Sequence, residues 1–312
     1  MKYRKLGSSG LLVSEVSLGG WITFGGTIEE DTARAIVRRA VDAGINFIDL
    51  ADVYARGEAE KVVGRMLGDF TRENLILSSK VYWPMSDDPN DKGLSRKHIV
   101  QSVERSLRNL GTDYLDFYFC HREDDQTALE ETSRAMDDLV HQGKVLYWGT
   151  SVWPAKSLKR AHDVADRRNL YAPQVEQPPY NLMERGVERD VLSTCAKLGM
   201  GVVVWSPLAG GMLTGKYNDG VPEGSRATTT SWLDGKLTED NLPRLRRFSA
   251  LAAELEVRPE QLALAWVLTR PEVTSVITGA TRVEHVEHNL GAVEIEIPED
   301  ALRELGKIFP RS

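Results

Sequence analysis

The sequence predicts an α/β fold: a closed (β/α)8 barrel with an N-terminal β-hairpin and a long loop after its seventh strand. Two patterns support this. Helix-like segments end four times on a glycine that an apolar run follows, at Gly44, Gly111, Gly143 and Gly199. Eight short runs have strand character, and eight β/α units in one chain favour a closed barrel. The 312 residues, 41% of them hydrophobic, suffice for one barrel, so we expect a single domain over 1–312.

The eight expected strands are short runs rich in β-branched and aromatic residues. They span Val16–Leu18, Phe47–Leu50, Leu75–Lys80, Leu115–Cys120, Val145–Gly149, Gln174–Gln177, Val202–Ser206 and Thr274–Ile277. Helical spacing separates them, as at Ile99, Val103 and Leu107 behind an expected N-cap at Ser95. The stretch TIEE that begins at Thr27 has the spacing of a capping box and is expected to start the first helix.

Two irregular segments complete the expected fold. Residues 2–13, which contain a Gly-Ser-Ser-Gly turn, are expected to form the hairpin. Residues 210–245, rich in Gly, Thr and charge, are expected to form the long loop, and long loops are often functional. A doubly wound sheet is the alternative, but a dinucleotide-binding one carries G-x-G-x-x-G after its first strand, and the sequence has no such motif there.

Composition argues against several classes of partner. A net charge of −7 and an isoelectric point near 5.5 disfavour nucleic-acid and anionic-membrane surfaces, because both reward clustered Lys and Arg. Cys120 and Cys195 form no CxxC pattern and fit a reducing compartment. The N-terminal MKYRKL lacks the apolar segment of a signal peptide, and no apolar run is long enough to span a membrane. We expect a cytoplasmic enzyme with a small-molecule substrate, and homo-oligomers are compatible with the sequence.

Polar residues end three successive expected strands. The segment INFIDLADVYARGEAE, residues 45–60, begins as a strand, ends it at Asp49, places Tyr54 five residues later and then starts a helix. The third strand ends at Lys80, and the fourth runs into His121. Because the C-terminal ends of barrel strands meet at one mouth, we expect these side chains to converge. Singly, each has an ordinary structural interpretation, such as a capping carboxylate, a half-buried ring, a snorkelling lysine or a satisfied histidine.

Together the four groups indicate a proton donor that works beside a hydride donor. Free tyrosine has a pKa of about 10, too high for efficient proton transfer near neutrality. A protonated Lys80 about 4 Å away, at an effective dielectric near 20, would stabilise the tyrosinate of Tyr54 by roughly 4 kcal/mol. We therefore expect Lys80 to lower the pKa of Tyr54 toward neutrality. Asp49 would hold Lys80 in place, and His121 would orient a substrate carbonyl oxygen.

In order and position, Asp49, Tyr54, Lys80 and His121 resemble the catalytic tetrad of the aldo-keto reductases. The resemblance spans nearly the whole chain and is strongest with the branch that contains the voltage-gated potassium-channel β-subunits and their bacterial relatives. It is carried by LGGWITFGG (18–26), YWGTS (147–151), EQPPYN (176–181), WSPLAGGMLTGKY (205–217) and GSRA (224–227). It implies a TIM barrel that binds NADPH, with NADH as an alternative, and reduces aldehyde or ketone carbonyls with hydride from nicotinamide and a proton from Tyr54.

The resemblance also implies which residues bind the cofactor. Ser151 and Gln177 match positions that hydrogen-bond the nicotinamide carboxamide, and Trp205 matches the aromatic residue that stacks on the nicotinamide ring. Lys216 and Arg226 suit contact with the pyrophosphate. The other implied cofactor residues are Gly20, Trp21, Asp49, Ser206, Pro207, Leu208, Gly210, Gly279, Thr281, Arg282, His285 and Asn289. Without the resemblance, the polar ones and the indoles would equally fit a core in which buried groups satisfy one another.

The adenosine segment, residues 279–289, departs from the family pattern. Thr281 replaces the more common serine, His285 stands where glutamine is typical, and His288 stands where glutamate often occurs. The two histidines have no evident third ligand, so no metal is expected. Arg282 and the helix expected over 282–290 suit a 2′-phosphate, which predicts a preference for NADPH.

The substrate pocket is expected to be aromatic, as small-molecule sites often are. The expected substrate contacts are Trp21, Tyr54, Trp83 and His121, and Tyr82, Trp153 and Tyr180 lie on other loops expected at the same mouth. Two further functions remain open. The first is a nicotinamide-binding regulatory or redox-sensing subunit with incidental turnover, and the second is a hydrolytic or isomerising barrel that uses Asp49 and His121.

Overall fold

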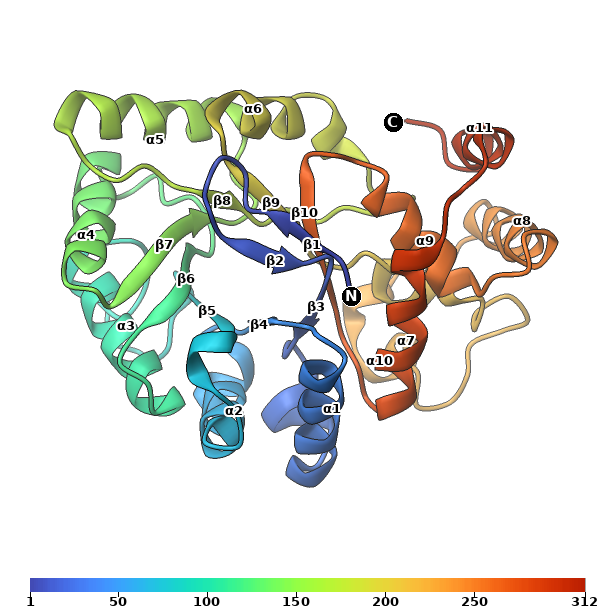
Figure 1. Cartoon of the computed structure of the whole chain (residues 1–312), viewed down its shortest axis with the longest axis horizontal. Helices are drawn as coiled ribbons and strands as arrows, with labels where there is room; N and C mark the ends of the chain where they lie inside the picture. The colour runs from blue at the N-terminus through green and yellow to red at the C-terminus, as the bar shows by residue number, and fades with distance from the viewer. Residues whose placement is uncertain (312) are drawn as a thin grey trace.

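The computed structural model describes residues 1–311 and contains a closed barrel of eight parallel strands. Around the barrel the strands follow the order β10-β3-β4-β5-β6-β7-β8-β9, and β9 pairs again with β10 (Figure 1). They span β3 Val16–Gly19, β4 Phe47–Asp49, β5 Ile76–Val81, β6 Leu115–Cys120, β7 Val145–Thr150, β8 Val175–Glu176, β9 Gly201–Val204 and β10 Val273–Thr278. The predicted (β/α)8 class is thus confirmed, with strand ends displaced by no more than two residues.

Helices surround the barrel (Figure 1). They span α1 Glu30–Asp42, α2 Glu58–Leu67, α3 Arg96–Leu110, α4 Leu129–His141, α5 Ala155–Arg168, α6 Val191–Leu198, α7 Arg226–Thr229, α8 Asn241–Glu254, α9 Pro259–Leu268, α10 Val283–Leu290 and α11 Glu299–Ile308. Shorter helical turns lie at Thr23–Thr27, Tyr54–Gly57, Arg72–Asn74, Gly186–Glu188, Ala209–Thr214, Ser231–Leu233 and Gly291–Glu294. α8 and α11 lie beyond the ring and pack together, with the rings of Phe248 and Phe309 5.9 Å apart.

The N-terminal hairpin, β1 Tyr3–Lys5 and β2 Leu12–Ser14, pairs antiparallel as predicted. Its Leu6 and Val13 are buried with residues from inside the barrel, so the hairpin closes the end opposite the strand C-termini. The approach is close: a Cβ on Gly7, whose φ is +53°, would lie 2.2 Å from the carbonyl oxygen of Gly199.

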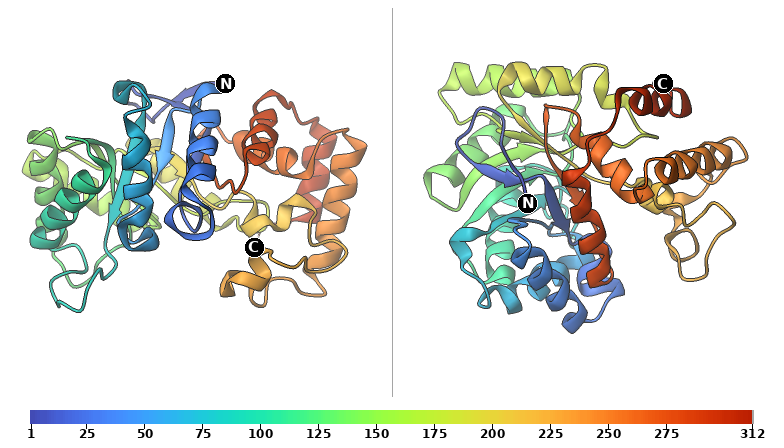
Figure 2. Two further views of the ribbon diagram at one scale, coloured as in Figure 1. Left: turned by 90° about the horizontal axis from the view of Figure 1, so that it is seen from below. Right: turned by 45° about the vertical axis from the view of Figure 1, so that its right-hand side comes forward.

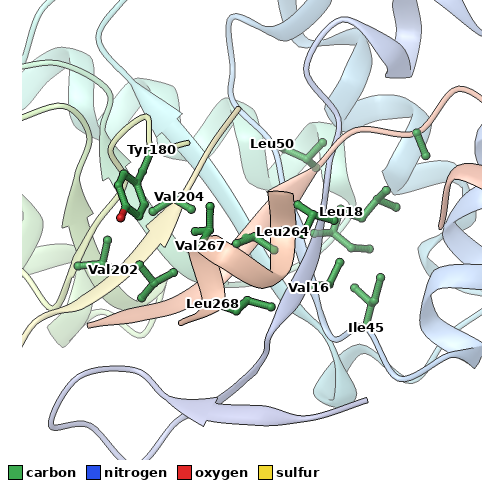
Figure 3. Packing of buried hydrophobic residues seen from close by; sticks show 14 of the residues in the cluster. Val16, Leu18, Ile45, Leu50, Tyr180, Val202, Val204, Leu264, Val267 and Leu268 are labelled. Atoms are coloured by element: carbon green, nitrogen blue, oxygen red, sulfur yellow. The ribbon is translucent and has the colours of Figure 1, made fainter. Parts of the chain in front are cut away.

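Alternation along the strands separates an inner core from an outer one. In β6, Phe117 and Phe119 pack inside the barrel, whereas Tyr118 and Cys120 pack outward with the helices. Figure 3 shows part of the outer core, where Leu264, Val267 and Leu268 of α9 lie among side chains from β9 and β3, including Val202, Val204, Val16 and Leu18. Both faces of these strands are buried and most of their residues are apolar, which is why the strands read as largely apolar runs rather than as alternating patterns.

Several local predictions are confirmed and one is wrong. Ser95 caps α3 by accepting a hydrogen bond from the amide of His98, and the glycines that end helix-like segments all have positive φ, between +65° and +89°. The capping box at Thr27 does not form. Residue 29 is the N-cap of α1, and the Thr27 hydroxyl instead donates to the carbonyl of Ile22 at 3.1 Å. Residues 23–27 form a separate helical turn, so the chain enters α1 later than the local pattern suggests.

The segment after β9 is more structured than the predicted loop. The region 210–245 contains α7, two single turns and the start of α8. Figure 2 shows it projecting from the barrel in both turned views. No helix within residues 1–311 combines the length and apolarity needed to cross a bilayer.

Candidate active site

A cleft of about 1380 Å³ opens at the C-terminal ends of the strands. Strand register aligns these ends: Asp49 pairs with Ser78, Val81 with Cys120, and Cys120 with Thr150. At one end the cleft is lined by Tyr54, Trp83 and His121, and at the other by the segment from Gly279 to Asn289. It is therefore long enough to combine a reaction centre with a separate binding end.

Three of the four predicted catalytic residues form one hydrogen-bonded group. The Lys80 ammonium donates to both Asp49 carboxylate oxygens, at 2.9 and 2.7 Å, to the Leu50 carbonyl at 2.6 Å, and to the Tyr54 hydroxyl oxygen at 3.1 Å. Lys80 is fully buried beneath the cleft floor, so none of its charge is exposed. Asp49 Oδ1 also accepts from the Ser78 hydroxyl at 2.8 Å. The structure thus places a buried cation directly against the tyrosine oxygen.

The expected direction of the Tyr54 pKa shift is wrong. Burial, and then the negative charge of Asp49, hold the pKa of Tyr54 well above its ordinary value. Burial also lowers the pKa of Lys80, and Asp49 opposes that shift. The Lys80 ammonium lies close enough to stabilise a tyrosinate, but the burial of the tyrosine oxygen and the charge of Asp49 outweigh that stabilisation. Tyr54 is therefore protonated at neutral pH, which is the form that can donate a proton.

His121 completes the group at the wall of the cleft. Its ring lies 6.1 Å from the Tyr54 ring and 6.2 Å from the Trp83 ring, centroid to centroid. Burial, then the charges of Lys80 and Arg122, lower the pKa of His121 well below its usual range, so the imidazole is neutral. Its buried Nδ1 has no partner among the described residues. A neutral imidazole here can donate one hydrogen bond to an oxygen beside Tyr54.

Two of the predicted nicotinamide residues are joined to this group. The Gln177 side-chain amide donates to Asp49 Oδ1 at 2.8 Å, and the Ser151 hydroxyl donates to the main-chain carbonyl of Gln177 at 2.9 Å. Trp205 lies edge-on to Trp21, with ring centroids 6.3 Å apart. All four side chains line the cleft, next to the tetrad.

The segment after β9 builds the middle of the cleft. Ser206 has a φ of +55° and Gly210 one of +69°, so two turns hold the backbone in the left-handed region along the lining. Arg226 lies on α7 with its guanidinium carbon 5.8 Å from the Trp21 ring, and no carboxylate pairs with it among the described residues. The neighbouring Ser225 hydroxyl is buried without a partner. Unpaired donors along a glycine-containing turn suit an anionic ligand. Pro207, Leu208 and Lys216 line the same stretch.

The far end of the cleft is built around His285 at the start of α10. Arg282 is the N-cap residue, and its Nε donates to His285 Nε2 at 2.9 Å. Thr281 lies 3.4 Å from the other imidazole nitrogen. Burial, then Arg282 and Lys216, lower the pKa of His285, so the imidazole is a neutral acceptor that orients Arg282. The residues predicted to contact the adenosine end, Gly279, Thr281, Arg282, His285 and Asn289, all line the cleft.

Besides Lys80, four predicted residues lie outside the cleft lining. Gly20 is buried against Leu50 and Phe24, and its neighbour Gly19 lines the cleft in its place. Tyr82 packs behind Trp83, with ring centroids 5.1 Å apart. Trp153 and Tyr180 are buried in the outer core. The Tyr180 hydroxyl donates to Glu188 at 2.7 Å. Aromatic residues near strand ends thus divide between the cleft and the core, a division that local sequence does not indicate.

Other lining residues were missed by sequence reasoning. Trp232 reaches the cleft from the long segment and packs edge-on to Trp21 at 4.7 Å. Arg122 directly follows His121, and its position just past a strand end could have suggested it. Ile22, a β-branched residue with a φ of +69°, also lines the cleft, and strained backbone of this kind is frequent at functional sites.

Comparisons with known proteins agree with the resemblance. The aldo/keto reductase family model matches residues 15–309. Proteins of Oryza sativa subsp. japonica and Arabidopsis thaliana, each named a probable voltage-gated potassium channel subunit beta, are 43% identical over 302 residues, 95% of this chain and 92% of each relative. A putative voltage-gated potassium channel subunit beta of Schizosaccharomyces pombe is 40% identical over 319 residues, 98% of this chain and 93% of its own. The chain belongs to the aldo/keto reductase family.

Proposed function

We propose that the protein is an NADPH-dependent oxidoreductase that reduces aldehyde or ketone carbonyls to alcohols. The observation that carries this proposal is the contact between the Lys80 ammonium and the Tyr54 hydroxyl oxygen, 3.1 Å apart, at the wall of a cleft that continues to the Arg282 end. A protonated phenol beside a buried cation is suited to give its proton to a basic oxygen.

The residues of the cleft fit a nicotinamide dinucleotide. Gln177 and Ser151 present amide and hydroxyl groups near the tetrad, and Trp205 offers an aromatic surface beside them. Further along, the Ser225 hydroxyl and the Arg226 guanidinium have no partner among the described residues, as expected of groups that bind phosphate. When bound, the reduced cofactor would supply the hydride.

Asp49, Tyr54, Lys80 and His121 would then bind the substrate oxygen and supply its proton. The substrate carbonyl oxygen accepts hydrogen bonds from the Tyr54 hydroxyl and the neutral His121 imidazole, which fix its position and polarise the carbonyl. As negative charge develops on that oxygen, Tyr54 transfers its proton to it. The Lys80 ammonium stabilises the tyrosinate that remains, and Asp49 keeps Lys80 protonated and in place. This arrangement provides stabilisation where charge appears during the reaction.

Tyr54→Phe tests the proposal. Loss of the hydroxyl should lower the turnover of a small aldehyde by about 10²–10⁴-fold, the usual contribution of general acid catalysis, and leave NADPH affinity nearly unchanged. The assay is steady-state oxidation of NADPH, with dissociation constants measured by fluorescence titration. A variant that kept more than about a tenth of wild-type turnover would show that Tyr54 is not the acid.

The names of the relatives favour a second candidate, a nicotinamide-binding regulatory or redox-sensing subunit of a channel. The same cleft would then retain the cofactor as a signal rather than use it rapidly. Mass spectrometry of copurifying nucleotide, followed by a panel of carbonyl compounds, separates the two. Tight retention with negligible turnover across the panel favours the sensor, and turnover many-fold above background favours the enzyme.

A further inference from the structure

We infer that Arg122 selects substrates that carry an anionic group, a carboxylate or a phosphate, a few carbons from the carbonyl. This inference rests on the proposed reduction and names its substrate class. Arg122 directly follows His121, lines the cleft and lies with its guanidinium carbon 5.6 Å from the centre of the Trp83 ring.

The Arg122 guanidinium is largely unsatisfied. It donates one hydrogen bond, to the carbonyl of His121, and no carboxylate lies within 4.0 Å of it among residues 1–311. Arginine has five N–H donors in a planar fork that matches a carboxylate or phosphate. Burial lowers its pKa, although the side chain still lines the cleft. A partly buried guanidinium with free donors gains most from an anion that arrives with the ligand.

Arg122 is set apart from the cations expected to hold the nucleotide. The charges of Arg282 and Lys216 both lower the pKa of His285 at the far end of the cleft, and Arg226 lies over the Trp21 ring. Arg122 instead adjoins Trp83 and the tetrad. A nucleotide that occupied the Arg226 to Arg282 stretch would leave Arg122 free for the substrate.

The acidic groups near Arg122 do not replace a ligand. Glu176 is fully buried, where it accepts from the Thr150 hydroxyl and from the Trp153 amide at 3.2 Å. Burial raises the pKa of Glu176 to about 7, so it carries only part of a negative charge near neutrality. Asp124, two residues after Arg122, accepts from backbone amides and from Thr127. Neither carboxylate forms an ion pair with Arg122.

A purely structural role for Arg122 is the alternative. Its bond to the His121 carbonyl and its contact with Trp83 would then serve only to fix the loop after β6. The two roles differ in what they predict for charged and neutral substrates, because a structural residue affects both alike.

The test compares matched acids and esters. The substrates are 4-oxobutanoate, 5-oxopentanoate and 6-oxohexanoate with their methyl esters, and glycolaldehyde phosphate with glycolaldehyde. Wild type should prefer at least one anionic member by about tenfold or more in kcat/KM, mainly through KM, as one charge-assisted contact provides. Preference for the oxo acids identifies a carboxylate, and preference for the phosphate identifies a phosphate.

Variants then assign that preference to Arg122. In Arg122→Met the ratio of anionic to neutral kcat/KM should fall by about tenfold to a hundredfold, and Arg122→Lys, which keeps the charge but loses the fork, should retain part of it. Arg160→Met is the matched control, because Arg160 is an exposed arginine on α5 outside this cleft and has no ion pair within residues 1–311. Its ratio should equal that of wild type.

The outcomes separate the inference from the proposed function. If no aldehyde is reduced at all, the reductase proposal fails and this inference fails with it. If wild type reduces no oxo acid better than its ester and glycolaldehyde phosphate no better than glycolaldehyde, the reductase stands and anion recognition is refuted. If Arg122→Met does not fold, the salt dependence of wild type provides the test. Electrostatic recognition predicts that the wild-type ratio of anionic to neutral kcat/KM falls as ionic strength rises, and a constant ratio contradicts the inference.

Discussion

Replacing Lys80 with methionine removes the only charged group that touches both Asp49 and Tyr54 among the described residues. At 3.1 Å and an effective dielectric near 20, the ammonium stabilises a tyrosinate by at most about 5 kcal/mol. Reorganisation reduces that figure, and we expect kcat to fall by about 10²–10⁴-fold. The Asp49 carboxylate, 3% exposed, would also lose its counter-ion, which should lower the free energy of unfolding by about 3–5 kcal/mol.

The double variant Asp49→Asn/Lys80→Met separates these two effects. Asp49 Oδ1 accepts from Ser78 and Gln177, both at 2.8 Å, and an asparagine oxygen can keep both bonds. Among residues 1–311 the other oxygen, Oδ2, accepts only from Lys80, so the amide nitrogen of the asparagine takes its place without a buried charge. The double variant should recover most of the stability that Lys80→Met loses, but none of its activity.

Urea unfolding and steady-state NADPH oxidation measure the two quantities. In the residual activity of Lys80→Met, the alkaline limb of the pH profile should move upward, because without the cation Tyr54 loses its proton at higher pH. This role of Lys80 is refuted if Lys80→Met keeps more than about a tenth of wild-type kcat with an unchanged pH profile. It is also refuted if the double variant regains activity together with stability.

Three further predictions concern the cofactor, the pH dependence of stability and the barrel wall. Arg282→Ala should weaken NADPH binding by about tenfold or more and leave NADH binding unchanged; equal affinity of wild type for both cofactors would remove the phosphate assignment. Burial raises the pKa of Asp52 to about 7 from an unfolded value near 3.9, so the stability it contributes is complete below about pH 4 and is lost as pH rises through about 7. In Asp52→Asn the urea midpoint should therefore change less with pH between about 4 and 7 than it does in wild type. An equal pH dependence in the two proteins would contradict this prediction. In Gly149→Ala the new Cβ would lie 2.4 Å from Val175 Cγ1, so the free energy of unfolding, measured with urea, should fall by about 1–3 kcal/mol. In Gly186→Ala the new Cβ meets no described atom within 4 Å, so the free energy of unfolding should fall by less than half as much.

The barrel and the tetrad could be predicted because their signals are local. Gly44 and Gly111, both with positive φ, each follow the end of a helix, and the buried parallel strands are rich in apolar residues. Parallel order then brings strand ends to one mouth, so Asp49, Lys80 and His121 meet without any knowledge of side-chain packing.

The contents of the cleft could not be predicted in the same way. Trp232 lines it and Trp153 does not, although both follow strand ends in long or irregular segments. Their positions depend on how the segment after β9 folds back, and that is decided by contacts between residues distant in sequence. Local spacing also gave the wrong N-cap at Thr27, because residues 23–27 form a turn against the cleft.

The sequence by itself determined which groups are present, their order and the mouth at which they gather. The tertiary structure alone decided their protonation. The high pKa of Tyr54 and the low pKa of His121 come first from burial, a property of the whole surrounding fold, and only then from charged neighbours. Arg122 is a second example. The sequence shows that it follows His121, but only the packed chain shows that it has no carboxylate partner within residues 1–311.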